Sequence, residues 1–247
     1  MALKKTEAII LKKYLLRETS FILSVFTRDY GKVQGVVKGV RKPYPQFAGD
    51  YEIFTRCHIV FYEKPRSMDL ITQVEGVDSF VGIRKDIERL TYANYFIELI
   101  LVVVKEYDTN IILYETLLDS LHLLDTVTSA KRVARIFEMK FLQAIGLAPE
   151  LGICTFCARA AGKIKGFNAS SGGVVCEHCF SKDRKTLSIS LGTLKFLQKI
   201  QTSETKKLAN IKVSREVGIE AERVLLEFIG YHINRPMKSL KFLEKIM

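Results

Sequence analysis

The sequence predicts an α+β multidomain protein, in which a small N-terminal β-barrel precedes an α-helical domain with an inserted cysteine module. Three observations predict this layout. Residues 1–80 hold five short segments of strand-like composition. Residues 81–145 change to the helical spacing of apolar residues, and residues 146–185 are rich in glycine and cysteine. We therefore expect a barrel domain over 1–80 and a helical domain over 81–247, interrupted by a module at 150–183.

Five predicted strands occupy the N-terminal domain. They are Thr6–Leu16, Phe21–Thr27, Val33–Val37, Ile53–Tyr62 and Leu70–Val74. Alternation with a period of two is clearest in the fourth of them, and turn residues at Arg28–Lys32 and prolines within Arg41–Asp50 separate neighbours. Five short strands in so few residues fit a closed barrel, and an oligonucleotide-binding (OB) fold is the economical choice. An SH3-like barrel or an open meander also fits the pattern.

The predicted helices follow after Gly82. They are Ile87–Glu106, Asn110–Asp125, Ala130–Ile145, Ser190–Ile200 and Ser214–Ile233. In the third of these, Val133, Phe137 and Phe141 recur at the spacing of one buried face. The most apolar run, Leu99–Val104, is far shorter than the ~20 residues that a membrane span needs. It therefore predicts a buried helix and no membrane insertion.

The chain is strongly basic, with a net charge of +11 at pH 7 in 247 residues. This charge predicts polyanionic partners, either nucleic acid or an anionic membrane surface. The excess lies at the two ends of the chain. The first 42 residues carry ten basic and three acidic side chains, and residues 81–145 are almost neutral.

No secretory signal is evident at the N-terminus, where Met1–Lys13 lacks a long apolar run. Five cysteines are too few for a disulfide scaffold, and their odd number favours a reducing compartment. Both observations lead us to expect a cytoplasmic protein.

Two CxxC pairs form the strongest local motif. Cys154 and Cys157 are followed after 18 residues by Cys176 and Cys179, which is the spacing of a zinc ribbon. Each pair can direct two thiolates at one ion, and Zn²⁺ takes four thiolates in a tetrahedron. A filled shell of this kind predicts one structural Zn²⁺. His178, inside the second pair, is the alternative ligand.

Motifs of known enzymes are missing. The sequence has no phosphate-binding glycine loop, no nucleophile elbow and no zinc-protease helix. The histidines do not cluster, and acids such as Asp29, Asp50 and Asp69 show no spacing that favours a two-metal nuclease. The sequence therefore predicts a binding protein and not an enzyme.

A basic turn is the candidate nucleic-acid contact of the N-terminal domain. Lys38, Arg41 and Lys42 follow a predicted strand, and Lys32 lies at the start of that strand. Phosphate-tracking grooves of OB barrels combine such cations with aromatic stacking faces. Tyr14, Tyr44, Phe47 and Tyr51 are candidates for stacking, although packing within the domain or its loops is the commoner role.

Several segments together resemble the RecO family of bacterial DNA repair and recombination mediators, over nearly the whole chain. They are Lys5–Leu11, Phe26–Lys32, Lys38–Lys42, Ile145–Leu151 leading to Cys154, Ile189–Leu194 and His232–Leu243. Singly these are modest signals, but their order along the chain is specific.

This resemblance implies a non-enzymatic mediator that binds single- and double-stranded DNA through an OB domain. Such proteins anneal complementary strands coated by single-stranded DNA-binding protein (SSB), engage the acidic C-terminal tail of SSB, and with RecR help RecA to load. The resemblance also implies a nucleoid-associated location, DNA contacts by Lys32, Lys38, Arg41 and Lys42, and zinc on the four cysteines.

The basic C-terminal stretch is a further candidate for contact with DNA or with the SSB tail. It contains Arg235, Lys238 and Lys241. The alternative is a solvated helix end, where cations complement the helix dipole. Two other functions remain open at this point: a zinc-ribbon RNA-binding or translation-associated factor, and an undetected nuclease or nucleotidyl transferase.

Overall fold

The computed structural model describes residues 2–16, 20–38, 51–64, 67–126, 129–159 and 163–246. Its chain forms two compact units, one made of Met1–Thr126 with Ser239–Met247 and the other of Val127–Lys238. Among the described residues, every helix is too short or too polar to cross a bilayer. The domain boundary expected between residues 80 and 81 stays a prediction.

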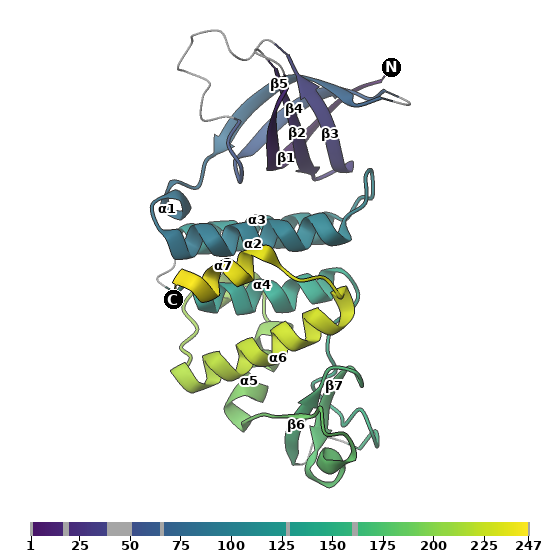
Figure 1. Ribbon diagram of the computed structural model, residues 1–247, viewed down its shortest axis with the longest axis vertical. Coiled ribbons are helices and arrows are strands. Elements are labelled where there is room, and N and C mark those ends of the chain that lie inside the picture. Colours follow the sequence, from purple (N-terminus) through teal and green to yellow (C-terminus); the bar gives the residue numbers. More distant parts are fainter. Residues whose placement is uncertain are drawn as a thin grey trace. The chain divides into compact units, whose positions relative to one another are not determined.

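The barrel of the first unit is closed and has five strands (Figure 1). The strands are β1 (Leu3–Leu16), β2 (Ser20–Thr27), β3 (Gly31–Val37), β4 (Arg56–Tyr62) and β5 (Asp69–Asp78). They follow the order β1-β2-β3-β5-β4, and β4 closes the ring by pairing with β1. Only β3 and β5 are parallel among these neighbours. The predicted OB-like barrel is confirmed.

Alternating side chains fill the barrel. In β1, Ala8 and Ile10 are fully buried and belong to a core with β-branched residues of the other strands, such as Val25, Val33 and Ile59. A register shift between Ile10 and Lys12 interrupts the pairing of β1 with β2. Such a bulge bends a long strand, and this bend lets β1 pair with two neighbours in a small barrel.

Strand limits differ from the prediction where the backbone departs from extended geometry. β4 begins at Arg56 and not at Ile53, because Phe54 has a φ of 74° and its N–H donates to the carbonyl of Ile10. β5 continues beyond Val74 to Asp78 through exposed residues, which carry no apolar alternation.

Four helices complete the first unit: α1 (Val81–Arg84), α2 (Ile87–Val103), α3 (Ile111–Thr126) and most of α7 (Lys238–Ile246). Asp86 caps α2 by accepting a hydrogen bond from the N–H of Arg89. At the start of α7, the N–H and hydroxyl of Ser239 donate to Glu98 of α2 at 3.0 and 2.6 Å. Neither α1 nor α7 was expected from the sequence.

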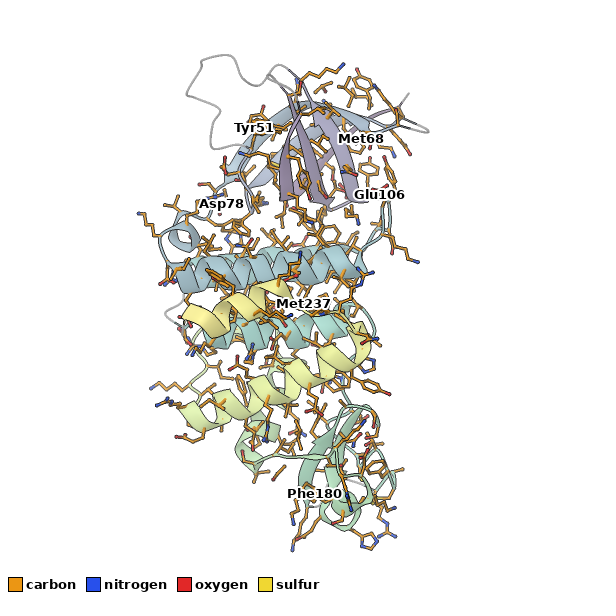
Figure 2. All side chains as sticks on the ribbon, viewed as in Figure 1. Tyr51, Met68, Asp78, Glu106, Phe180 and Met237 are labelled. Atoms are coloured by element: carbon orange, nitrogen blue, oxygen red, sulfur yellow. The ribbon has the colours of Figure 1, made fainter. Side chains whose placement is uncertain are left out.

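The second unit contains α4 (Ala130–Ala144), α5 (Leu191–Thr202), α6 (Arg215–Ile233) and a small sheet. The sheet has the order β7-β6-β8, from β6 (Ile164–Asn168), β7 (Gly173–Cys176) and β8 (Leu187–Ser188). Figure 2 shows how side chains fill the space between these elements. The sheet and the cysteine pairs form a module between α4 and α5. The limits of 150–183 expected for it stay a prediction, and β8 lies beyond residue 183.

Glycine is required at the turn between β6 and β7. Gly172 has a φ of +89°, and a Cβ on Gly173 would lie 2.2 Å from the carbonyl oxygen of Glu150. This close approach allows Val174 N–H to donate to the Glu150 carbonyl at 2.9 Å. The hairpin thereby holds the segment that leads to the first cysteine pair.

Candidate functional site

The four cysteines predicted as ligands lie together. The Sγ atoms of Cys154, Cys157, Cys176 and Cys179 all lie within 4.8 Å of one another, and none of these cysteines is in a disulfide. Cys154 and Cys179 are fully buried. The first pair precedes β6, and the second lies at the end of β7 and in the 3₁₀ turn Glu177–Lys182.

The sulfur geometry fits a metal ion. The Sγ atoms of Cys157 and Cys176 are 3.9 Å apart. This distance agrees with the separation of about 3.8 Å between two sulfurs of a tetrahedral ion with Zn–S bonds of about 2.3 Å. A disulfide would require about 2.05 Å. Four thiol sulfurs within 4.8 Å of one another can therefore hold one metal ion, and they would complete its coordination shell without an open position.

Backbone donors favour a thiolate at this cluster. The N–H of Cys176 lies 3.3 Å from the sulfur of Cys154. Burial acts to raise the pKa of Cys154, but N–H donors from Cys176, Phe156 and Cys157 outweigh it and lower this pKa. Burial raises the pKa of Cys179. Four thiolates crowded together without a cation would repel one another, so the arrangement suits a divalent cation.

The predicted DNA contacts of the barrel differ in their environments. Lys38 is exposed directly after β3, whereas Arg41 and Lys42 lie outside the described residues. Lys32 is half-buried, and its Nζ donates to the carbonyl of Val104 at 2.8 Å. Val104 is the C-cap of α2, so Lys32 ties the barrel to the negative end of this helix. Its role in DNA binding stays a prediction.

The predicted stacking residues also differ in their environments, and Tyr44 and Phe47 lie outside the described residues. Tyr14 of β1 is 48% exposed, which leaves its ring accessible. Tyr51 packs against the barrel core, with its ring centroid 6.1 Å from that of Phe21. Packing is thus the observed role of Tyr51.

The predicted C-terminal cations are all exposed. Arg235 and Lys238 belong to the second unit, and Lys241 belongs to the first. Lys238 and Lys241 both lie on α7, three residues apart. Contact of these side chains with DNA or with SSB stays a prediction.

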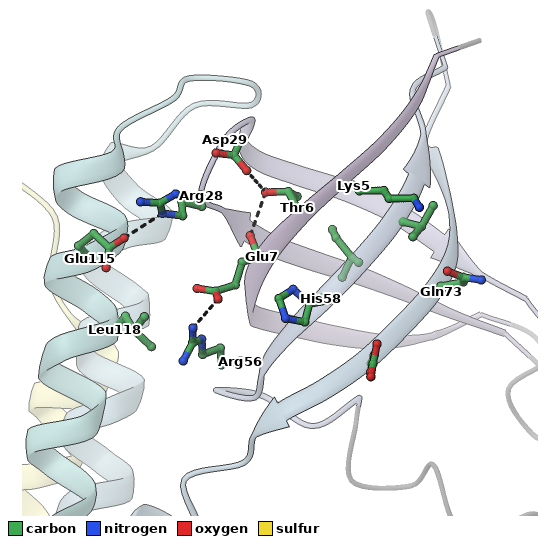
Figure 3. Close-up of a pocket in the computed structure, with 13 residues that line it drawn as sticks. Lys5, Thr6, Glu7, Arg28, Asp29, Arg56, His58, Gln73, Glu115 and Leu118 are labelled. Atoms are coloured by element: carbon green, nitrogen blue, oxygen red, sulfur yellow. Dashed lines mark hydrogen bonds and ion pairs between the residues drawn. The ribbon is translucent and has the colours of Figure 1, made fainter.

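A polar groove of about 720 Å³ lies within the first unit, beside β1, β4 and β5 (Figure 3). Its charges are mixed, because Arg28 pairs with Glu115 of α3 at 2.9 Å and Arg56 pairs with Glu7. Thr6 donates to Asp29 at 2.6 Å. Arg28 and Arg56 are therefore already paired, and Lys5 is the one lysine or arginine of the groove lining without an ion pair within 4.0 Å among the described residues.

Glu7 lies at the centre of this groove. Its carboxylate accepts hydrogen bonds from Arg56 and from the hydroxyl of Tyr114. Burial acts to raise the pKa of Glu7, but the two hydrogen bonds outweigh it and lower this pKa. Burial, together with the hydrogen bond to Glu7, raises the pKa of Tyr114. These groups join the barrel to α3 and were not singled out from the sequence, since only the fold brings residues 7 and 114 together.

A cationic pocket of about 240 Å³ lies within the second unit. Its charged lining residues are Lys131, Arg132, Arg135, Arg215 and Glu222, and its apolar lining includes Phe196, Val213 and Ile219. It also contains the N-caps of α4 and α6, whose backbone amides carry partial positive charge.

Two of the pocket arginines are partly engaged. Arg135 binds Glu138 at 2.7 Å and Glu222 at 2.9 Å, and Arg132 donates to the carbonyl of Ala209 at 3.2 Å. Lys131 and Arg215 are exposed. Sequence reasoning missed this pocket. The one sequence signal for the pocket was a serine N-cap followed by basic residues at the starts of two helices. This signal is weak because many surface helices have it without lining a pocket.

Comparison with known proteins identifies both parts of the chain. Residues 1–80 match the family model for the N-terminal part of recombination protein O, and residues 84–241 match the model for its C-terminal part.

Full-length relatives agree with these matches. The DNA repair protein RecO of Pelotomaculum thermopropionicum is 31% identical over 99% of this chain and 95% of its own length. Those of Desulforamulus reducens and Symbiobacterium thermophilum are 32% and 30% identical, over the whole of this chain and 96% and 98% of their own lengths. With its closed barrel, its helical part and matches along its whole length, the chain belongs to the RecO family of DNA repair and recombination proteins.

Proposed function

We propose that this protein is a recombination mediator of the RecFOR type and not an enzyme. It binds single- and double-stranded DNA, anneals complementary strands coated by SSB, and with RecR promotes loading of RecA in DNA repair. The observation that carries this proposal is the family match over residues 1–80 and 84–241, which covers the barrel and the helical part together.

The physical basis of annealing is charge. Two DNA strands repel each other, and a protein of net charge +11 can neutralise phosphates on both. Lys38, exposed at the end of β3, is the described residue best suited to begin this contact. Arg41 and Lys42 follow it closely in sequence and extend the same basic segment.

The metal proposed for the cysteine cluster is one Zn²⁺. Sulfur-only sites with two CxxC pairs favour this ion, and four thiolates leave no position for a reacting water. Its role is therefore to fold the module. Cys154, Cys157, Cys176 and Cys179 would hold it.

The pocket of the second unit is proposed to receive the acidic C-terminal tail of SSB. Its cations and two helix N-caps complement carboxylates, and Phe196 and Ile219 offer apolar surface to a terminal side chain. The pocket contains one acid, Glu222, which Arg135 neutralises. The C-terminal cations Arg235 and Lys238 stay secondary candidates for this partner.

The cellular location that follows from these partners is the cytoplasm, in association with the nucleoid. RecF participation is not required by the chemistry of annealing itself.

Strand annealing without nucleotide and without added divalent metal tests the proposal. A mediator pairs complementary DNA under these conditions. A preference for RNA over DNA would instead support an RNA-binding factor, and cleavage that appears on adding a divalent metal would support a nuclease.

A further inference from the structure

We propose that the cysteine module carries a second nucleic-acid surface, which holds one strand by its phosphates while the barrel holds the other. The inference deepens the proposed function and rests on it. The surface is called the module face here and consists of six cations: Arg159, Lys163, Lys165, Lys182, Arg184 and Lys185.

All six cations of the module face are exposed. Within the described ranges, none of them forms an ion pair within 4.0 Å. The acids of the module are fewer, namely Glu150, Glu177 and Asp183. One carboxylate oxygen of Glu150 accepts a hydrogen bond from the N–H of Gly152 at 2.6 Å, so this acid stabilises the turn that follows it.

The fold of the module brings Lys163 and Lys165, at the start of β6, close to the segment that carries Lys182, Arg184 and Lys185. The carbonyl of Lys163 accepts from the N–H of Glu177 at 2.9 Å, which places the start of β6 beside the 3₁₀ turn that ends at Lys182. The carbonyl of Lys165 accepts from Ile189 N–H at 3.0 Å, so β6 also lies beside the segment that follows the turn at Asp183–Thr186.

The turn that presents Arg184 and Lys185 is fixed by Asp183. One oxygen of Asp183 accepts from the N–H of Lys185 at 2.9 Å, and the other accepts from the Asn168 side chain at 2.9 Å. These hydrogen bonds lower the pKa of Asp183, the largest effect coming from the Lys185 N–H. The carboxylate is thus committed to the turn, while the two cations remain exposed.

The aromatic residue of this surface decides which part of DNA it fits. Phe180, shown on the module in Figure 2, has the Nζ of Lys165 5.1 Å from its ring centroid. A Cβ on Gly166 would lie 2.8 Å from Phe180 Cδ2, so the ring also lies against β6. With the Lys165 ammonium over its ring, the half-buried Phe180 holds a cation at this surface, and this cation favours a phosphate as its partner. The module face therefore fits the phosphates of DNA, and we expect it to bind them whatever the base sequence.

The test uses one variant of the full chain, called the module variant, which combines three charge reversals: Lys165→Glu, Lys182→Glu and Lys185→Glu. A matched control reverses three exposed cations elsewhere in the second unit: Lys195→Glu, Lys199→Glu and Lys212→Glu. Both variants have the same net charge, so a general electrostatic effect is identical in the two. Unchanged metal content and unfolding temperature show that each variant is folded.

The probe is a pair of oligothymidylates labelled with a donor and an acceptor dye, which cannot pair with each other. Energy transfer between the two dyes then shows that the protein holds two strands together. We expect the wild type and the control to give this signal, and the module variant to lose about tenfold or more of second-strand capture. We expect the salt slope of that capture to flatten by about 2, at ~0.7 per lost phosphate contact.

The outcomes separate this inference from the proposed function. If the wild type binds and bridges DNA and the module variant equals the control, the inference is overturned and the proposed function stands. If the variant bridges DNA normally but loses binding to an acidic protein, the module face is a protein-binding surface and the inference is overturned as well. If the wild type binds no DNA, both fail.

Discussion

The hydroxyl of Tyr114 in α3 donates to Oε1 of Glu7 in β1 at 2.8 Å, across 107 residues of sequence. Tyr114 is fully buried, and its ring also packs edge-on against Phe26 at 5.7 Å between centroids. Because Arg56 of β4 binds the same carboxylate, Glu7 links two strands of the barrel to a helix. The barrel of this unit is thereby joined to its helices by a partly buried polar contact.

Removing the hydroxyl with Tyr114→Phe is expected to lower the free energy of unfolding by about 1–3 kcal/mol, since hydrogen bonds to charged groups contribute this much. Urea unfolding of the two proteins measures it. Tyr14→Phe is the matched control, because the Tyr14 side chain is largely exposed. Equal losses in the two variants would show that the contact with Glu7 contributes nothing.

The metal of the cysteine cluster is expected at about one Zn²⁺ per chain in freshly purified protein. Cys154→Ser should lose the metal and lower the unfolding temperature, because structural zinc contributes directly to folding. His178→Gln is the control, since His178 is exposed and lies outside the sulfur cluster. Elemental analysis and thermal unfolding with and without a chelator measure both effects. Metal-free wild-type protein that ignores the chelator would refute the site.

The basic segment after β3 is expected to contact phosphates. Lys38→Glu combined with Arg41→Glu should weaken binding to many single-stranded sequences alike and flatten the salt slope by about 1.4, at ~0.7 per contact. Lys195→Glu with Lys199→Glu provides the same change of charge on α5. Titrations at several salt concentrations decide the matter, and an unaltered slope with unaltered affinity would remove this segment from the DNA interface.

The cationic pocket is expected to bind an acidic peptide that ends in an apolar residue. Arg215→Glu should reduce the affinity about tenfold, because one charge-assisted contact is lost and a repulsive one is introduced. Calorimetric titration measures this, with Lys199→Glu as the control outside the pocket lining. Equal affinity in all three proteins would mean that the tail binds elsewhere.

Local patterns were sufficient to predict most of the barrel and the long helices. Val133, Phe137 and Phe141 share one face in the sequence and are all buried in α4. The two CxxC pairs likewise indicated the cysteine cluster from spacing alone. Very short helices and strand limits set by an unusual backbone angle were not predictable in this way. The α1 helix has only four residues, and the start of β4 depends on Phe54, a non-glycine residue with positive φ.

Long-range partners explain what the sequence could not indicate. Lys32 was a candidate DNA contact because it is a cation in a basic part of the sequence. In the structure its ammonium group donates to the carbonyl of Val104, 72 residues away. Glu98 of α2 receives Ser239 from the start of α7, 141 residues away. Such pairings depend on the packed fold and leave no periodic signal in the chain.

Annealing of two complementary strands that are both coated with SSB tests the central claim most directly. With the purified protein, no nucleotide and no added divalent metal, duplex should form much faster than with SSB alone. RecA loading is followed in a separate reaction that contains RecR, ATP and Mg²⁺. Duplex formation at the rate of the SSB control, by protein that is folded and carries its metal, would contradict the assignment.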